Sequence, residues 1–189
     1  MKPLALAALV AFAAPMFAAV PVVPVAPAKQ KDLLKSDDPK LAVNKKLAYD
    51  FFRIVLQGRR LELADQYMTN DYMQHNPNAE TGMAGFKAYF SALPGGPQPI
   101  PETLPGLVTL QAEGDYVTMS FVREYDDPAG GGKKYTTTWF DMLRIVDGKV
   151  VEHWDSAMKG AVGPVAAAAK PAAPAKPAGA TKAAPKGKQ

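Results

Sequence analysis

Two aspartates, Asp141 and Asp155, stand among apolar and aromatic residues in the stretch FDMLRIVDGKVVEHWDS, residues 140–156. Apolar neighbours disfavour the charged form of a carboxyl group, and a second carboxylate nearby disfavours it further. Two acids in such an environment can divide the roles of general base and general acid between them. The chemistry that this pattern predicts is proton abstraction next to a carbonyl group, provided that both side chains reach one pocket.

Whether the two aspartates share a face depends on the turn between them. The segments on both sides of Asp147-Gly148 alternate with a period of two, which predicts an antiparallel hairpin. A two-residue turn places the aspartates on opposite faces of the sheet. A three-residue turn, with Gly148 as the left-handed residue of a bulge, places them on the same face.

The pattern of apolar residues favours the three-residue turn. In that register Arg144 and Glu152 meet diagonally as an ion pair on one face. Asp141 then lies opposite His153, and Asp155 opposite Trp139. The two-residue turn would instead move Glu152 onto the more apolar face. We therefore predict that one mostly apolar face carries these seven residues: Trp139, Asp141, Leu143, Ile145, Val151, His153 and Asp155.

Three helices are predicted before the hairpin. The first begins at Asp38 and ends at Gly58, and a 4-4-3 spacing gives it one apolar face with Val43, Leu47, Phe51 and Ile54. A short second helix covers residues 60–68, and an extended segment follows at 71–77. The third helix ends at Pro94, and it carries Met83, Phe86, Phe90 and Leu93 on one face.

A proline-rich crossing, residues 95–106, leads into segments with a period of two. Residues 107–113 and 116–125 flank Gly114-Asp115 and predict a second hairpin. Helices followed by a four-strand antiparallel meander indicate an α+β domain, with helices packed on one face of a curved sheet. No βαβ pattern or glycine-rich phosphate loop supports a nucleotide site.

The two ends of the chain differ from the middle. Residues 1–28 have one early lysine and then an uncharged apolar run, which predicts a signal peptide and a short linker, with cleavage between Ala18 and Ala28. Export to the periplasm or secretion follows, and a retained anchor is the alternative. Residues 160–189 are rich in alanine, proline and lysine, which predicts a disordered tail. One domain, residues 29–159, lies between them.

The formal charge of +4 comes from the tail. Subtracting the five tail lysines leaves −1 for residues 1–159, so the charge gives no reason to expect nucleic-acid binding. The tail lysines predict a weak contact of the tail with acidic envelope surfaces. The chain has no cysteine, which excludes disulfides, thiol nucleophiles and an acylated lipoprotein.

Three motifs in order resemble the SnoaL-like branch of the nuclear transport factor 2-like superfamily: YMQHNP from Tyr72, GMAGFKAYF from Gly82 and FDMLRIVDGKVVEHWD from Phe140. The resemblance covers residues 40–158. It implies a cone-shaped curved antiparallel sheet, wrapped by about three N-terminal helices around a pocket, in a domain that often forms a homodimer through the sheet. Relatives include polyketide cyclases, which perform aldol chemistry with an acid/base aspartate and no cofactor, and more distantly ketosteroid isomerase and dehydratases.

By position, the resemblance assigns the general acid/base role to Asp155. Asp141 takes the place of its polar partner, where the cyclases can carry another residue. His75 matches a histidine that is common in this branch. The expected pocket residues are Tyr72, Trp139, His153, Leu143, Met119 and Phe121.

Each candidate has a structural alternative. Asp155 fits a loop cap or a lysine partner, and both histidines fit ordinary hydrogen-bonding roles. His75, His153, Asp141 and Asp155 are also admissible metal ligands, although no helix-spaced pair supports a metal site and none is predicted. Three functions stay open: a cofactor-independent lyase or isomerase on a small apolar carbonyl compound, a periplasmic pocket that binds a small apolar molecule without catalysis, and a dimeric scaffold tethered by the tail.

Overall fold

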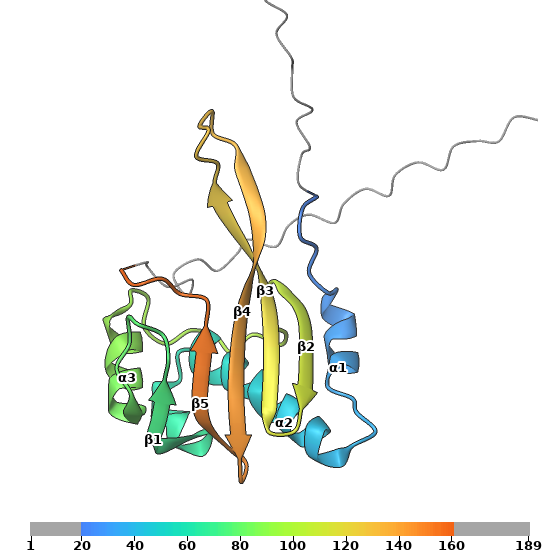
Figure 1. Cartoon of the computed structure of the whole chain (residues 1–189), viewed down its shortest axis with the longest axis vertical. Coiled ribbons are helices and arrows are strands. Elements are labelled where there is room, and N and C mark those ends of the chain that lie inside the picture. The colour runs from blue at the N-terminus through green and yellow to red at the C-terminus, as the bar shows by residue number, and fades with distance from the viewer. Residues whose placement is uncertain (1–19, 161–189) are drawn as a thin grey trace, which may run out of the picture.

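The computed structural model describes residues 20–160 (Figure 1). The predicted tail and most of the predicted signal peptide lie outside the described residues. Within residues 20–160, no helix has the length and the apolar character that crossing a membrane requires. The described part of the expected linker contacts the domain, because the backbone N–H of Val25 donates to Leu107 O at 2.7 Å and that of Val22 donates to Thr136 Oγ1 at 2.9 Å.

The three predicted helices are present, and a short fourth precedes them. The first predicted helix begins as expected, because Asp38 accepts a hydrogen bond from the backbone of Lys40 at 2.8 Å and Pro39 occupies the first turn. The helical elements are the turn η1 (Pro27–Lys29), α1 (Gln30–Leu33), α2 (Pro39–Asp50), its π-helical continuation η2 (Phe51–Gln57), the 3₁₀ helix η3 (Leu61–Gln66) and α3 (Gly82–Ala92).

The predicted apolar face of the first helix is wrong at its start. Val43 is 60% exposed, and the buried side chains of α2 and η2 are instead Asn44, Ala48, Tyr49, Phe51, Phe52, Val55 and Leu56. The π-helical turns of η2 carry more residues per turn than an α-helix. A 3.6-residue period that includes Phe51 and Ile54 therefore points to the wrong face when it is extended back through α2.

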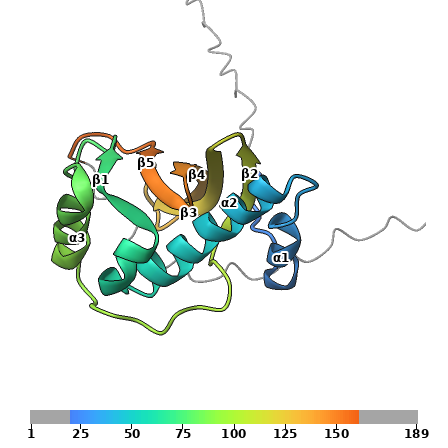
Figure 2. The same cartoon turned by 90° about the horizontal axis from the view of Figure 1, so that it is seen from below.

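The sheet has five strands in the order β1-β5-β4-β3-β2. The four-strand meander is confirmed, and β1 adds a fifth strand that runs parallel to β5, which the period-two pattern did not place in the sheet. Figure 2 shows α2 crossing one face of the curved sheet, with α3 beside β1. The α+β fold class is confirmed. The strands are β1 (Met68–Gln74), β2 (Leu107–Glu113), β3 (Tyr116–Asp126), β4 (Lys134–Val146) and β5 (Lys149–Asp155).

The hydrophobic core lies between this face of the sheet and the helices. Phe52 of η2 stacks on Phe121 of β3 with ring centroids 5.5 Å apart, and Phe51 packs against Phe86 of α3 at 5.8 Å. Burying aromatic and aliphatic side chains together removes apolar surface from water, which is the main favourable contribution to folding. We call the helix-covered face of the sheet the interior face.

The turn between β4 and β5 has two residues, so the predicted three-residue turn is wrong. Val146 pairs with Lys149, while Asp147 and Gly148 both have positive φ values, 49° and 70°. Positive φ at both central positions is the geometry that an Asp-Gly pair favours in a tight hairpin, because its twist matches that of the strands.

Asp141 and Asp155 nevertheless share a face as predicted, because β5 contains a bulge, although Val150 rather than the predicted Val151 is the buried residue of that face. Ile145 pairs with Val150 and Arg144 with Glu152, so Val151 is an extra residue that shifts the register by one. Asp141 therefore pairs directly with Asp155, rather than with His153 as predicted.

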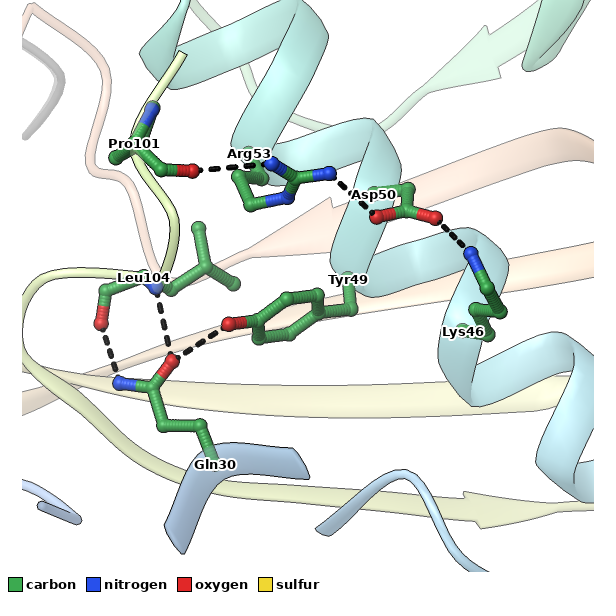
Figure 3. A network of polar contacts seen from close by, with 7 residues as sticks. All are labelled: Gln30, Lys46, Tyr49, Asp50, Arg53, Pro101 and Leu104. Carbon is green, nitrogen blue, oxygen red and sulfur yellow. Dashed lines mark hydrogen bonds and ion pairs between the residues drawn. The ribbon is translucent and has the colours of Figure 1, made fainter. Parts of the chain in front are cut away.

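A buried polar network fastens α1 to the proline-rich crossing (Figure 3). The Gln30 amide donates to Leu104 O at 2.7 Å, and its oxygen accepts from Tyr49 Oη and Leu104 N, both at 2.8 Å. One helical turn further, Arg53 donates to Asp50 and to Pro101 O, each at 3.1 Å. The crossing is thus held against α1 and η2.

Candidate active site

A pocket of about 60 Å³ opens between the interior face of the sheet and the helices. Its helical side is apolar and aromatic, whereas its sheet side carries nearly all of the ionisable groups. This is the usual composition of a small-molecule site, in which a few polar groups converge in an apolar cavity. The lining residues are Phe51, Phe52, Leu56, Gln57, Tyr72, Gln74, Asn76, Ala79, Phe86, Tyr89, Phe90, Phe121, Arg123, Trp139, Asp141, His153 and Asp155.

Asp155, at the end of β5, lines the pocket with a fixed carboxylate. Asn76 Nδ2 donates to its Oδ2 at 2.6 Å, and the backbone N–H of Ala157 donates to its Oδ1 at 2.9 Å. The capping role considered from the sequence is thus present together with the pocket position. Two N–H donors hold the carboxylate in place, and its remaining lone pairs are free to accept a proton.

The orientation of His153 is set by the Gln74 amide. His153 Nδ1 lies 2.8 Å from Gln74 Oε1, which also accepts from the backbone N–H of Asn76 at 2.9 Å. Gln74 Nε2 in turn donates to Tyr72 Oη at 2.9 Å. Because an amide oxygen can only accept, His153 Nδ1 must carry a proton.

The other ring nitrogen of His153 faces the Asp141 carboxyl group. His153 Nε2 lies 3.1 Å from Asp141 Oδ1, and Asp141 is only 8% exposed. A hydrogen bond here requires a proton on one of the two atoms, which gives either an imidazolium beside a carboxylate or a neutral imidazole beside a carboxylic acid. A proton held between these two atoms is one that the pair can donate to a ligand.

Tyr72 offers a hydroxyl proton to the pocket. Its side chain is buried, and burial, followed by the nearby charges of Asp155 and Asp141, raises the pKa of the hydroxyl well above its usual value. The group therefore stays protonated throughout the working pH range. Its oxygen already accepts from Gln74, which leaves its hydrogen as a donor for a ligand.

The structure brings together most, but not all, of the predicted site residues. Asp141, Asp155, Tyr72, Trp139, His153 and Phe121 line the pocket. Leu143 and Met119 lie on the interior face but are fully buried in the core rather than lining the pocket.

His75 is not in the pocket, because it points to the opposite face of the sheet. Its ring stacks on Trp154 with centroids 4.8 Å apart and planes 3° from parallel. Its Nε2 lies 2.9 Å from Glu152 Oε1, and the other oxygen of Glu152 accepts from Arg144 at 3.1 Å. Its side chain is 44% exposed. His75 thus orders the outer face of the sheet.

Among the lining residues that were not predicted as site residues, three belong to the strand side of the pocket and bear on its polar chemistry: Gln74, Asn76 and Arg123. The signal that could have found them is the period of two. With Tyr72 assigned to the pocket, the same alternation selects Gln74 and Asn76 and excludes His75. With Phe121 assigned, it selects Arg123.

Asp141, His153 and Asp155 could also hold a metal ion. Each offers one ligand atom, and these atoms lie within 4.8 Å of one another. The contact of His153 Nδ1 with Gln74 leaves Nε2 as the ligand atom, an arrangement common around metal-bound histidines. His75 lies on the other face and cannot join this set.

Comparison with known proteins gives a family and several structures of similar fold. Residues 48–153 match the family model of the SnoaL-like domain, and a search of curated proteins gave no match. Among solved structures, TsrD from Streptomyces laurentii is 19% identical, with 64% of this chain and 90% of that chain covered and a TM-score of 0.41. A proposed polyketide cyclase from Acidithiobacillus ferrooxidans is 20% identical, with coverages of 64% and 89% and a TM-score of 0.44.

Proposed function

The chain belongs to the SnoaL-like domain family, and from that premise we propose that its pocket catalyses cofactor-independent acid/base chemistry on a small carbonyl compound. The observation that carries the proposal is the convergence of a fixed carboxylate, Asp155, and a hydrogen-bonded pair, His153–Asp141, on one pocket. One group accepts a proton and the other donates one, which is what enolisation requires.

In the proposed step, Asp155 removes a proton from the carbon next to the carbonyl. The electrons of the broken C–H bond form the enolate, and Tyr72 donates a hydrogen bond to its oxygen. An isomerase would then return a proton to a different carbon. A cyclase would let the enolate carbon attack a second carbonyl, and the shared proton of His153–Asp141 would neutralise the new alkoxide.

The pocket volume bears on the size of the substrate. Sites for drug-sized ligands usually have volumes of about 300–1,000 Å³, whereas this pocket has about 60 Å³. A compound of a few carbon atoms fits the pocket as it stands. A polycyclic substrate would need Phe90 or Tyr89 of α3, which line the helical side, to move.

Solvent-deuterium exchange tests the proposal without knowledge of the natural substrate. Small ketones and keto acids are incubated with the protein in D2O, with and without EDTA, and loss of α-proton signals is followed by NMR. Asp155→Asn should slow the exchange by about 100-fold or more, while Asp71→Asn, an exposed aspartate on the neighbouring strand, should leave it unchanged. Equal rates for Asp155→Asn and the unaltered protein would contradict the proposal, and EDTA sensitivity would favour the metal alternative.

We also propose that the protein forms a homodimer through the outer face of its sheet. Phe140 and Tyr116 on that face are 52% and 43% exposed. Exposed aromatic residues are enriched where proteins associate. Phe140→Glu should then convert a dimer to a monomer in sedimentation. Export remains a prediction from residues 1–28, which fractionation of cells that express the full chain would test.

A further inference from the structure

Two residues that line the pocket each carry an N–H donor with no hydrogen-bond partner among residues 20–160. The donors are Nε of Arg123 and Nε1 of Trp139, and both atoms are buried. A donor that has lost water without gaining an acceptor destabilises the folded protein. Such groups persist where a ligand supplies the missing acceptor, and one acceptor group could serve both donors.

The two donors lie at one corner of the interior face. Phe121 of β3 pairs with Trp139 of β4, and Arg123 is two residues further along β3. Side chains two residues apart on a strand point to the same face, so Arg123 and Trp139 are diagonal neighbours across the strand pair. We call these two residues the Arg123–Trp139 corner.

The corner carries a positive charge that no acid neutralises within ion-pair distance among the described residues. The one hydrogen bond of the Arg123 guanidinium goes from Nη1 to its neighbour's carbonyl, Val122 O, at 3.3 Å, and its Cζ lies 5.7 Å from the centroid of the Phe121 ring. Burial lowers the pKa of Arg123 from its usual value, while the charge of Asp141 opposes this change. An arginine nevertheless remains charged.

The remaining charges of the pocket fit an anion at this corner. Asp141 is hydrogen-bonded to His153, and Asp155 is held by two N–H donors at the end of β5, so neither carboxylate forms an ion pair with Arg123. A guanidinium matches the two oxygens of a carboxylate better than it matches a single carbonyl oxygen. The Trp139 indole adds one more donor to the same group.

We propose that the Arg123–Trp139 corner binds the carboxylate of the substrate, which makes the substrate a small keto acid. This inference rests on the proposed function for the carbonyl part, because Asp155 and Tyr72 act there. The carboxylate anchors one end of the molecule at the corner, and the carbon to be deprotonated faces Asp155. The small pocket limits the compound to a few carbon atoms.

NMR of the indole N–H groups tests this in the full chain. The protein has two tryptophans, so Trp154→Phe assigns the Trp139 signal. We titrate with pyruvate and with pyruvamide, which has the same shape without the charge. We expect a saturable shift of the Trp139 signal with pyruvate and at least tenfold weaker binding of pyruvamide. Equal binding of pyruvate and pyruvamide, or no saturation, would overturn the inference, and this outcome needs no variant of Arg123.

Variants of Arg123 then test whether this residue binds the carboxylate. Arg123→Gln should weaken pyruvate binding at least tenfold, and Arg123→Lys, which keeps the charge but not the planar fork, should weaken it less. Arg60→Gln, beside Glu62 on the surface, is the matched control and should bind as the unaltered protein does. Unchanged pyruvate affinity in a folded Arg123→Gln would refute the role of the arginine.

The two proposals fail separately. Saturable, charge-dependent pyruvate binding without deuterium exchange on any carbonyl compound would support the corner and reject the enzyme. Exchange of neutral ketones at rates equal to those of keto acids, with no preference for pyruvate over pyruvamide, would support the enzyme and reject the corner.

Discussion

Asp141 and Asp155 pair directly across β4 and β5, and a single inserted residue, Val151, is the reason that they do. The tight Asp147-Gly148 turn alone would set Asp141 opposite Trp154 and turn Asp155 to the outer face. The bulge moves Asp155 by one position and leaves Arg144 paired with Glu152 on the outside. The acidic pair of the pocket and the ion pair of the outer face therefore depend on the same irregularity.

The register can be tested with a disulfide. In a chain without cysteine, Asp141→Cys with Asp155→Cys should oxidise to an intramolecular disulfide, because directly paired residues lie about 4.5–5.5 Å apart. Asp141→Cys with Trp154→Cys is the matched control and should remain reduced, because its side chains point to opposite faces. Free-thiol counting and mass spectrometry distinguish them, and a disulfide in the control pair alone would place the strands in the regular register.

Most of the fold could be predicted from the sequence because its signals are local. Alternation on both sides of Gly114-Asp115 and Asp147-Gly148 identified four strands, and Asp38-Pro39 identified the start of α2. The parallel pairing of β1 with β5 could not be predicted, because it joins segments about 80 residues apart and leaves no local pattern. The bulge at Val151 also has no sequence signal, since valine is common in regular strands.

The candidate site was predicted in part for the same reason. Asp141, Asp155 and His153 were identified because apolar neighbours make them conspicuous. His75 was a candidate only through its match to a histidine that is common in the SnoaL-like branch, and its side chain faces away from the pocket. Gln74 and Arg123 line the pocket, and Gln74 contacts His153. The sequence does not single them out, because polar residues are ordinary on the exposed parts of strands. Only consistent use of strand alternation separates these cases.

Gln30 should contribute strongly to stability although it lies outside the pocket. It is 2% exposed and satisfies three polar groups, Leu104 N, Leu104 O and Tyr49 Oη. Gln30→Ala should lower the free energy of unfolding by about 2–4 kcal/mol, because it leaves buried groups without partners. Urea unfolding measures this change. Lys31→Ala, an exposed residue of the same helix, should change it little, and a similar small effect for both variants would mean that water replaces the amide.

The outer face should give the protein an acid-sensitive contribution to stability. The hydrogen bond from His75, then that from Arg144, hold the pKa of Glu152 below its ordinary value of 4.5. A lowered pKa in the folded state means that the contribution is fully present above the unfolded value and disappears as the pH falls through the lowered one. The difference in Tm between the unaltered protein and Glu152→Gln should therefore shrink as the pH falls below about 4.5.

A second variant identifies the cause of this pH dependence. His75→Phe keeps an aromatic ring against Trp154 but removes the donor to Glu152. The pH-dependent Tm difference that Glu152→Gln causes should be smaller in the His75→Phe protein than in the protein that keeps His75. A difference of the same size would assign the effect to Arg144 alone.

Gln74 should act as a positioning residue for His153. Because Gln74 Oε1 can only accept, we expect Nδ1 of His153 to appear as a protonated nitrogen in ¹H–¹⁵N spectra at neutral pH. The chain has two histidines, so His75→Phe assigns the signals. Gln74→Leu removes the acceptor and lets the ring exchange between tautomers and orientations.

The same variant should affect turnover more than substrate binding. Without a fixed ring, His153 Nε2 no longer stays beside Asp141 Oδ1, and the shared proton is not held where it is needed. Deuterium exchange should fall by about 10- to 100-fold in kcat with little change in KM, because the lost interaction orients a proton donor rather than the substrate. Gln74→Glu keeps an acceptor for Nδ1 and should recover part of the rate. A change in KM alone would instead make Gln74 a direct contact of the substrate, with His153 held by its own packing.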